Sequence, residues 1–450
     1  MSILENQDFK DIKGYKKWIA FFLGLTSTMP IVGIHIGARD ISFYRILFLF
    51  MIIYTMVQAF QRRIVIGFAT KKLIIWLMVG IFSCLCGWIF LSSSAPEWSS
   101  AAASNIVRTG SLLAFALFWG SQKDTGYMNE AVCKGFFYGC LINCVWATID
   151  AAGYYLLGRS INNIVFAGYI ARNKIRYDSL SLIYGSSGMI RSGGFNSDPA
   201  QLGFIAPIVA CYGVCKKKYW MLIIAGGAIL ASASTTALVT SIIVCMYNVH
   251  RIKGNHGITL KKLLLIMGVI LVVTGITMVY WSQISRVIGS AYSRFSNRIG
   301  EVYLNNTKQD VRWDYIRCAP SAMIEVIPFL ALGSGFGTAS LGYSRSSFAI
   351  QTIGTRVNGP YDMENTYLAY FFDTGIVGII LFIIMLVFLI RKYKGKLKND
   401  KSKTSTIIYS FLLASTFSLA FYHYTLFASQ MLMFTIALSI LDREKGLSYV

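Results

Sequence analysis

The sequence predicts an all-α fold: a polytopic bundle of transmembrane helices with two large outward-facing loops. The 450-residue chain is 55% hydrophobic and only 14% charged, with a mean hydropathy of +0.56. Apolar runs near the length of about 20 residues that an α-helix needs to cross a bilayer recur along the whole chain. The alternating pattern of a β-barrel is absent, and only helices and closed barrels satisfy their backbone in lipid. A helical bundle is therefore expected.

Twelve spans are predicted, and the count falls to ten or eleven if the short seventh and eighth spans form one bent pair around Ser232–Thr236. The first is expected to be a retained span, because no short apolar stretch ends in a small-residue cleavage site. The predicted spans are residues 18–36, 41–60, 73–94, 104–120, 132–157, 199–215, 219–232, 236–249, 263–281, 365–390, 405–424 and 425–441.

These spans divide the chain into five regions. The regions are N-terminal helices (1–157), a first large outer loop (158–198), central helices (199–281), a second large outer loop (282–364), and C-terminal helices with a cytoplasmic tail (365–450).

The net charge of +22 follows the positive-inside rule. With the N-terminus inside, the inner segments carry 25 lysines and arginines, whereas the short outer loops carry only Arg39. Both termini are then cytoplasmic, and no nucleic-acid partner is needed to explain the charge. The nine cysteines include no CxxC pair, so neither a disulfide framework nor a metal site is expected.

The two large outer loops reverse the balance of basic residues. They hold eleven arginines and two lysines, whereas the inner segments hold twenty lysines and five arginines. The planar fork of arginine suits a bidentate grip on phosphate or carboxylate, while lysine acts as a hydrated point charge. The outer face is therefore predicted to hold an anion. The alternative is that these arginines pair with acidic residues of the same loops.

The first loop ends in a candidate phosphate pocket. Arg191 precedes two glycines, and Asp198 and Pro199 then suit the start of the sixth span. Glycines beside an arginine at the positive end of a helix favour phosphate binding. The alternative is a re-entry turn with one interfacial arginine.

The second loop carries an amphipathic turn and a glycine cluster. Arg312 and Arg317 lie in the turn, and Arg345 and Arg356 follow later in the loop. Gly333–Gly337, with the sequence GSGFG, lacks the Lys-Ser/Thr ending of a nucleotide-binding loop, so a tight turn is predicted.

Acidic and amide side chains mark the start of the tenth span. Glu364 and Asn365 lie at its predicted outer end, and Asp373 lies nine residues, or about 13 Å, deeper. Carboxylates are rare in lipid and are often functional. Glu364 suits a general base that accepts a proton from an acceptor hydroxyl. The alternative is a helix cap with a salt bridge to a loop arginine.

Three segments in this order resemble the O-antigen polymerase and O-antigen ligase superfamily of bacterial envelope enzymes. The first is RSGGFNSDPAQLGFIAP at Arg191–Pro207, which is similar to an Arg-x-Gly-x-Phe segment of the family. The second runs from DVRWDYI to PFLALGSGFGTAS between Asp310 and Ser340. The third is MENTYLAYFFDTGIVGIILF at Met363–Phe382, which is similar to the family's re-entry helix.

The resemblance implies a glycosyltransferase of the GT-C type that needs no metal and no other cofactor. Its donor would be an oligosaccharide on undecaprenyl diphosphate. Arg191 and Arg312 match positions that hold the donor diphosphate, and Glu364 matches the position where ligases carry a catalytic histidine, followed by asparagine as at Asn365. The catalytic set is thus predicted to be Glu364, Asn365 and Arg312, and the substrate-binding set to be Arg191, Arg317, Arg345, Arg356, Tyr367 and Asp198.

Glutamate at position 364 favours a polymerase that joins O-antigen or similar repeat units at the periplasmic face of the bacterial inner membrane. The resemblance also implies contact with membrane lipid and with a chain-length regulator protein. Two alternatives stay open. One is a ligase that hands finished glycan to lipid A–core, and the other is a flippase or other polysaccharide transporter, which would need charges along a path through the bundle.

Overall fold

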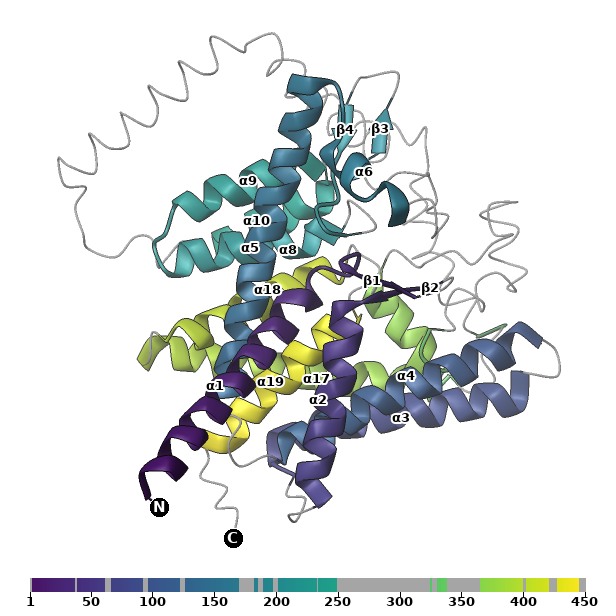
Figure 1. Cartoon of the computed structure of the whole chain (residues 1–450). Helices are drawn as coiled ribbons and strands as arrows, with labels where there is room; N and C mark the ends of the chain where they lie inside the picture. Colours follow the sequence, from purple (N-terminus) through teal and green to yellow (C-terminus); the bar gives the residue numbers. More distant parts are fainter. Residues whose placement is uncertain are drawn as a thin grey trace. The chain divides into compact units, whose positions relative to one another are not determined.

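In the part of the chain that the computed structural model describes, the fold is all-α apart from two short antiparallel hairpins, which confirms the predicted class (Figure 1). Its described residues fall into two compact units, Met1–Asn143 with Asp310–Val450, and Cys144–Gln309. The structure describes residues 2–36, 39–60, 66–91, 96–121, 126–169, 182–184, 189–196, 201–232, 234–248, 324–325, 330–337, 365–399, 402–420 and 427–444.

The first unit begins with two antiparallel helices joined by a hairpin. Helix α1 (Ser2–Ser27) leads into β1 (Gly33–Ile36), which pairs with β2 (Arg39–Ser42) before α2 (Phe43–Phe60), and Figure 1 shows the hairpin at one end of both helices. The predicted first span, 18–36, is wrong in its second half. The helix ends at Ser27 because threonine and serine side chains near its end bond back to carbonyls of the preceding turn, and proline follows at position 30.

Close contact between α1 and α5 (Gly126–Leu157) depends on small residues. A Cβ atom at Gly24, Gly135 or Gly139 would collide with the backbone of the facing helix. Small residues four apart allow the backbones of membrane helices to approach closely. Asn143, one turn further on the same face of α5, donates a 2.8 Å hydrogen bond to a carbonyl just beyond the end of α1. The contact is therefore held by packing and by one buried amide.

Helix α3 is central to the first unit. It spans Phe68–Leu91 and packs against α4 (Pro96–Gly120), α17 (Thr366–Asn399) and α19 (Phe427–Glu444). Helix α18 (Lys403–Ser418) packs against α17 and α19. These helices correspond to the predicted spans at 73–94, 104–120, 365–390, 405–424 and 425–441, with α17 continuing nine residues beyond its predicted end.

The N-terminus of α3 is capped by a residue from the other end of the chain. Asp442 of α19 accepts hydrogen bonds from the backbone N–H groups of Ala69 (2.6 Å) and Thr70 (2.8 Å) and from the Thr70 hydroxyl (2.7 Å). These amides belong to the first turn of α3, which has no intrahelical acceptor. The buried carboxylate also complements the positive end of the helix.

The second unit contains three short apolar helices. Helix α8 (Leu202–Cys215) packs against α9 (Trp220–Ser232) and α10 (Thr235–Tyr247). Ser234 caps α10 by accepting a 3.2 Å bond from the Ala237 N–H, so the two short predicted segments are separate helices. Helix α8 begins three residues later than predicted, with Gln201 rather than Asp198 at its N-cap.

Four of the described helices are long and apolar enough to cross a membrane, namely α2, α3, α5 and α17. Their outer faces carry half-exposed apolar side chains, such as Ile53, Phe82 and Ile380, as expected of helices that contact lipid. The chain has the apolar helices of a multi-pass membrane protein. The predicted ninth span, 263–281, lies outside the described residues, so the count of twelve stays a prediction.

Candidate functional site

Helix α17 is broken in the middle of its apolar span. Gly375 has φ +65° and ψ −167°, a conformation that ordinary L-residues rarely adopt. A break of this kind removes backbone hydrogen bonds on both sides of the glycine. In a membrane helix the freed groups need new partners inside the protein.

The glycine loop, residues Gly333–Gly337, and the residues just before it provide these partners. Two N–H groups of the loop donate to carbonyls of α17 that precede Gly375. Two carbonyls of the residues before the loop accept from N–H groups of α17 that follow Gly375. The bonds are Ser334 N–H to Phe372 O (2.9 Å), Gly335 N–H to Asp373 O (2.7 Å), Ile376 N–H to Leu330 O (3.1 Å) and Val377 N–H to Ala331 O (3.1 Å). The loop therefore replaces the missing turn of the helix.

The loop needs its glycines for two reasons. Gly333, Gly335 and Gly337 all have positive φ, at +72°, +107° and +77°. A Cβ atom at Gly335 would lie 2.6 Å from the Cα of Cys84, and a Cβ at Gly337 would lie 2.7 Å from the Asn105 amide. The predicted tight turn is confirmed. The turn packs between α3, α4 and α17, so its role is structural.

Asp373 ties the end of the glycine loop to α17. Its side chain is fully buried, and its Oδ2 accepts a 2.9 Å hydrogen bond from the Gly337 N–H. Gly337 is the last described residue before the stretch 338–364, which carries Arg345, Arg356 and Glu364. The carboxylate thus fixes Gly337, the last described residue before that stretch.

Aromatic packing holds the loop from the side. Phe336 lies edge-on to Trp76 with ring centroids 4.9 Å apart, and Trp76 lies 5.2 Å from Tyr370. Gly80 of α3 leaves the space that the Phe336 ring occupies. Edge-to-face pairs of this kind contribute about 0.5–1.5 kcal/mol each beyond their buried area. The loop is therefore anchored in the core of the first unit.

The start of α17 is fixed by Asn365 and by α18. The Asn365 Oδ1 accepts a 3.1 Å bond from the Leu368 N–H, which is the bonding of an N-cap residue. The Thr366 N–H donates to the Leu419 carbonyl (2.8 Å), and the Tyr367 hydroxyl donates to a backbone carbonyl of α18 (2.8 Å). Asn365, predicted to be catalytic, and Tyr367, predicted to bind substrate, thus both have structural partners in the protein.

In the second unit, Arg191 is the last residue of β4 (Met189–Arg191), which pairs with β3 (Leu182–Tyr184). Its Nε donates a 2.9 Å bond to the Ser232 carbonyl at the end of α9. The side chain is half-buried. Strand β4 and the end of α9 therefore orient the Arg191 guanidinium group.

Buried polar side chains support the turn after Arg191. The Asn162 Nδ2 donates to the Gly194 carbonyl (2.8 Å), and the Asn162 Oδ1 accepts from the Trp146 indole (2.7 Å). Asp150 accepts from the Asn162 N–H and from the Ser160 hydroxyl, both at 2.8 Å. Ser160 and Asn162 lie at the start of α6 (Ile161–Val165).

The remaining predicted site residues lie outside the described residues. These are Glu364, Arg312, Arg317, Arg345, Arg356 and Asp198. The structure brings Asn365 and Tyr367 together at the start of α17, and it places Arg191 in the second unit. Among the described residues, no three His, Cys, Asp or Glu side chains gather where they could hold a metal ion.

Sequence reasoning missed two parts of this arrangement. The glycine loop was predicted only as a turn, although Gly375 within an apolar span was a signal that the helix needs an external partner. Asp150 and Asn162 were not singled out. An aspartate inside a predicted span was the available signal for Asp150, because charged groups in such positions require partners.

Comparison with known proteins identifies one segment. Residues 220–383 match the model of the O-antigen ligase family, Wzy_C, which confirms the resemblance drawn from the sequence. The matched segment includes α9, α10, the glycine loop and the break in α17. No curated protein matches the chain. The match covers 164 of the 450 residues, so it shows that this segment is similar to the O-antigen ligase family.

Proposed function

We propose, from the O-antigen ligase family domain at residues 220–383, that the chain is a glycosyltransferase that polymerises lipid-linked repeat units at the outer face of a bacterial inner membrane. The donor is an oligosaccharide on undecaprenyl diphosphate. The single observation that carries the proposal is the family match over the broken helix and glycine loop. The choice of polymerase rests on Glu364, which replaces the histidine of ligases.

The chemistry follows from the leaving group. An acceptor sugar hydroxyl attacks the reducing-end sugar of the donor, and the bond from that sugar to the diphosphate breaks. Arg191 and Arg312 offset the charge that develops on the departing diphosphate, because planar guanidinium groups bind phosphate oxygens in pairs. Arg317, Arg345 and Arg356 extend this positive surface to the rest of the substrate. Asp198 and Tyr367 complete the predicted substrate-binding set.

Glu364 is the proposed general base. In the sequence it directly precedes Asn365, the N-cap of α17, and the start of that helix is bonded to α18. A helix N-terminus stabilises nearby negative charge. The broken helix and the glycine loop hold both ends of the stretch 338–364, one at Gly337 and the other at Asn365. This anchoring supports a site built on that stretch.

The main alternative is the ligase reaction, because the matching family model is described as O-antigen ligase. The acceptor would then be lipid A–core, with the same donor and the same leaving group. Loss of a ligase leaves long polymer on the carrier lipid, whereas loss of a polymerase leaves single units. A knockout therefore separates the two reactions.

The test is the banding pattern of surface glycan on a gel from a knockout strain. We expect a single-repeat band that the intact gene converts to a ladder. Glu364→Ala, Arg191→Ala and Arg312→Ala should each fail to restore the ladder at normal protein levels. Arg191→Lys is the matched control for charge: it should restore only a weak ladder, because lysine lacks the bidentate fork.

Three results would contradict the proposal. Long polymer retained on the carrier lipid would establish the ligase reaction. An unchanged ladder in the knockout would exclude both reactions for this glycan. A full ladder from all three alanine variants would show that the assigned residues are wrong.

A further inference from the structure

Arg108 is a charged residue inside a predicted membrane span, the span at residues 104–120. It lies in α4, and its side chain is exposed, as is that of the preceding Val107, which is 70% exposed. This part of α4 therefore faces outward from the first unit. Charged residues in membrane segments are costly to place in lipid and often mark substrate pathways. The proposed function does not use Arg108.

Arg108 lies close to the predicted outer surface of the membrane. It is four residues inside its predicted span, or about 6 Å at about 1.5 Å per residue. Its side chain interacts electrostatically with the hydroxyl groups of Tyr44 and Tyr370. Tyr44 is the second residue of α2, directly after the hairpin, and Tyr370 lies five residues, or about 7.5 Å, beyond Asn365, the N-cap of α17. Three helices thus place the guanidinium at one level, from which an arginine side chain reaches the membrane surface.

The packing of α2 against α4 independently brings Arg108 to Tyr44. The Phe115 ring lies 4.8 Å from the Phe48 ring, and Phe48 stacks on Tyr44 at 5.5 Å. Arg108 lies two turns before Phe115 on the same face of α4, and Tyr44 lies one turn before Phe48 on α2. The aromatic contacts between the two helices therefore lead to a guanidinium at their predicted outer end.

Arg108 also lies beside the end of the glycine loop. Asn105 is one turn earlier on the same face of α4, and a Cβ atom at Gly337 would lie 2.7 Å from its amide nitrogen. The Gly337 N–H is held by the buried carboxylate of Asp373. Gly337 is the last described residue before the stretch 338–364, which carries the proposed general base. Arg108 thus brings a positive charge to the described end of the glycine loop.

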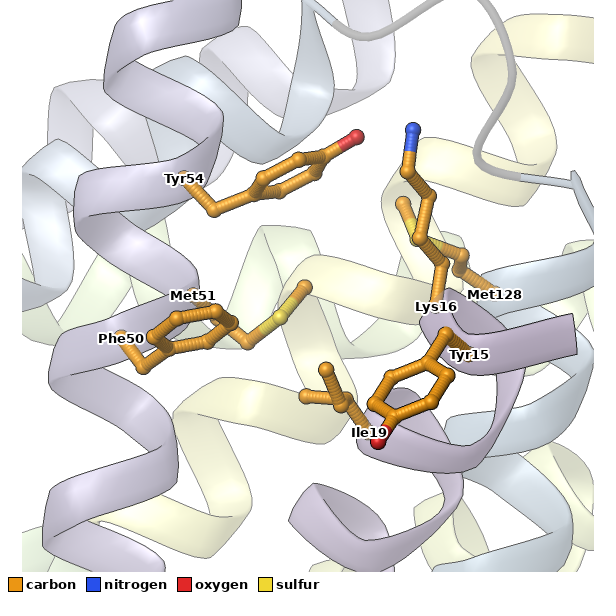
Figure 2. A pocket seen from close by; sticks show the side chains of 7 residues that line it. All are labelled: Tyr15, Lys16, Ile19, Phe50, Met51, Tyr54 and Met128. Carbon is orange, nitrogen blue, oxygen red and sulfur yellow. The ribbon is translucent and has the colours of Figure 1, made fainter. Parts of the chain in front are cut away.

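A second basic residue of the first unit, Lys16, lies in a different environment. Its ammonium group is 5.1 Å from the centre of the Tyr54 ring, beside a cavity of about 360 Å³ between α1, α2 and α5 (Figure 2). The atoms that face this cavity are apolar, as in Ile19 and Met51. The cavity therefore does not suit an anion, whereas the exposed Arg108 offers a planar fork to phosphate oxygens.

We propose that Arg108 contacts the diphosphate of the lipid-linked donor. The inference rests on the proposed function, which supplies a donor with its phosphate groups at the outer membrane surface and its hydrocarbon chain in the lipid. An arginine on an outward face of α4, close to that surface, can bind phosphate oxygens in pairs. The helix bundle then holds the donor next to the bilayer that contains its chain. The ligand is thus a lipid diphosphate rather than a free anion.

The test measures lipid retained by the intact purified protein. Detergent-solubilised protein is incubated with undecaprenyl diphosphate that carries no glycan, and bound lipid is counted by native mass spectrometry. Arg108→Gln should weaken retention about ten-fold, the loss expected for one hydrogen bond to a charged group. Arg108→Lys should weaken it about three-fold, since lysine keeps the charge but lacks the fork. Both variants should melt at the temperature of the intact protein, because the side chain is exposed.

Arg45→Gln is the matched control. Arg45 is also exposed and lies in the first turn of α2, so the same charge is removed near the same level, and retention should be unchanged. Equal losses in Arg45→Gln and Arg108→Gln would overturn the proposal in favour of a general effect of surface charge. Full competition by phosphatidylglycerol would overturn it as well, since any lipid phosphate would then bind.

Three other results would also overturn it. They are no retention of undecaprenyl diphosphate by the intact protein, unchanged retention in Arg108→Gln, and lower melting temperatures in both Arg108 variants, which would assign the residue a structural role.

The knockout strain separates this inference from the proposed function. If the intact gene restores the ladder and Arg108→Gln restores it equally well with normal lipid retention, only the inference about Arg108 is wrong. If the knockout leaves the ladder unchanged but retention of undecaprenyl diphosphate depends on Arg108, the polymerase is wrong and the lipid diphosphate site is supported.

Discussion

The break in α17 and the turn after Arg191 meet the same requirement in different ways. Both are irregular backbone segments packed against apolar helices, and both must satisfy buried polar groups. At the α17 break, the partners are backbone groups of the glycine loop and of the residues just before it, joined by four bonds of 2.7–3.1 Å. At the Arg191 turn, the partners are side chains, chiefly Asn162 with Asp150 behind it.

The difference determines which substitutions each region tolerates. Backbone pairing requires the two chains to approach closely, so the glycine loop should be sensitive to any added side chain. Side-chain pairing depends on the identity of a few buried polar residues, so the Arg191 turn should be sensitive to their removal. Substitutions in the two regions therefore test the comparison directly.

The largest effect is expected at Gly335 of the glycine loop. Gly335→Ala would place a Cβ atom 2.6 Å from the Cα of Cys84 and would force a left-handed φ of +107° on an L-residue. Backbone strain and overpacking together should cost about 4 kcal/mol of folding free energy. The measurement is the yield and melting temperature of the protein extracted from membranes.

Gly110 of α4 is the matched control. A Cβ atom there meets nothing within 4 Å, and φ is ordinary. Gly110→Ala should stabilise the helix by about 0.5–1 kcal/mol. If both alanine variants melted at the same temperature, close backbone pairing would not be what holds the α17 break.

The next largest effect is expected at Asn162 in the second unit. Asn162→Leu keeps the volume of the side chain but leaves the Trp146 indole and the Gly194 carbonyl without their partner. Two buried unsatisfied groups should cost about 3 kcal/mol in total. The measurement is the change in melting temperature, and no change would show that side chains do not hold the Arg191 turn.

Asp373 should affect activity more than stability. Asp373→Ala removes the acceptor of the Gly337 N–H and should cost about 2 kcal/mol. Because Gly337 leads into the stretch with Arg345, Arg356 and Glu364, we expect a shortened glycan ladder at normal protein levels. Asp373→Asn keeps an acceptor oxygen and should restore most of the ladder. Equal failure of both variants would point to a direct chemical role for the carboxylate.

The smallest effect is expected at Tyr367. Tyr367→Phe removes one hydrogen bond to the Thr416 carbonyl and should cost about 1 kcal/mol. If the bond to α18 is the main function of the hydroxyl, the glycan ladder should be unchanged. A lost ladder with an unchanged melting temperature would instead support the predicted contact with substrate.

The sequence predicted the helices well and the hydrogen-bonded partners poorly. Apolar runs placed α2, α3, α5 and α17 to within several residues, because lipid selects hydrophobic residues along a continuous segment. The first span failed after Ser27, where a hairpin replaces the helix even though its residues are apolar enough to continue it. Hydropathy alone does not report where a helix ends.

The predicted site residues divide into described and undescribed positions. Arg191 and the start of α17 were predicted as functional positions, and the structure shows which protein groups hold them, while the family match covers the second of these. Asn365 is an N-cap residue, which was one of the two interpretations that its position allowed. The roles of Glu364, Arg312, Arg317, Arg345, Arg356 and Asp198 stay predictions, because these residues lie outside the described part of the chain.

By itself, the sequence determined the apolar helices of a membrane protein, two long arginine-rich stretches between them and a segment similar to O-antigen ligases. These properties depend on composition and on neighbouring residues. Only the tertiary structure decided that Asp442 caps α3 through Ala69, 373 residues earlier in the chain. It also decided that the glycine loop supplies hydrogen-bond partners at the Gly375 break. The physical reason is that a buried hydrogen bond depends on which groups folding brings within 3 Å, and no local pattern records its distant partner.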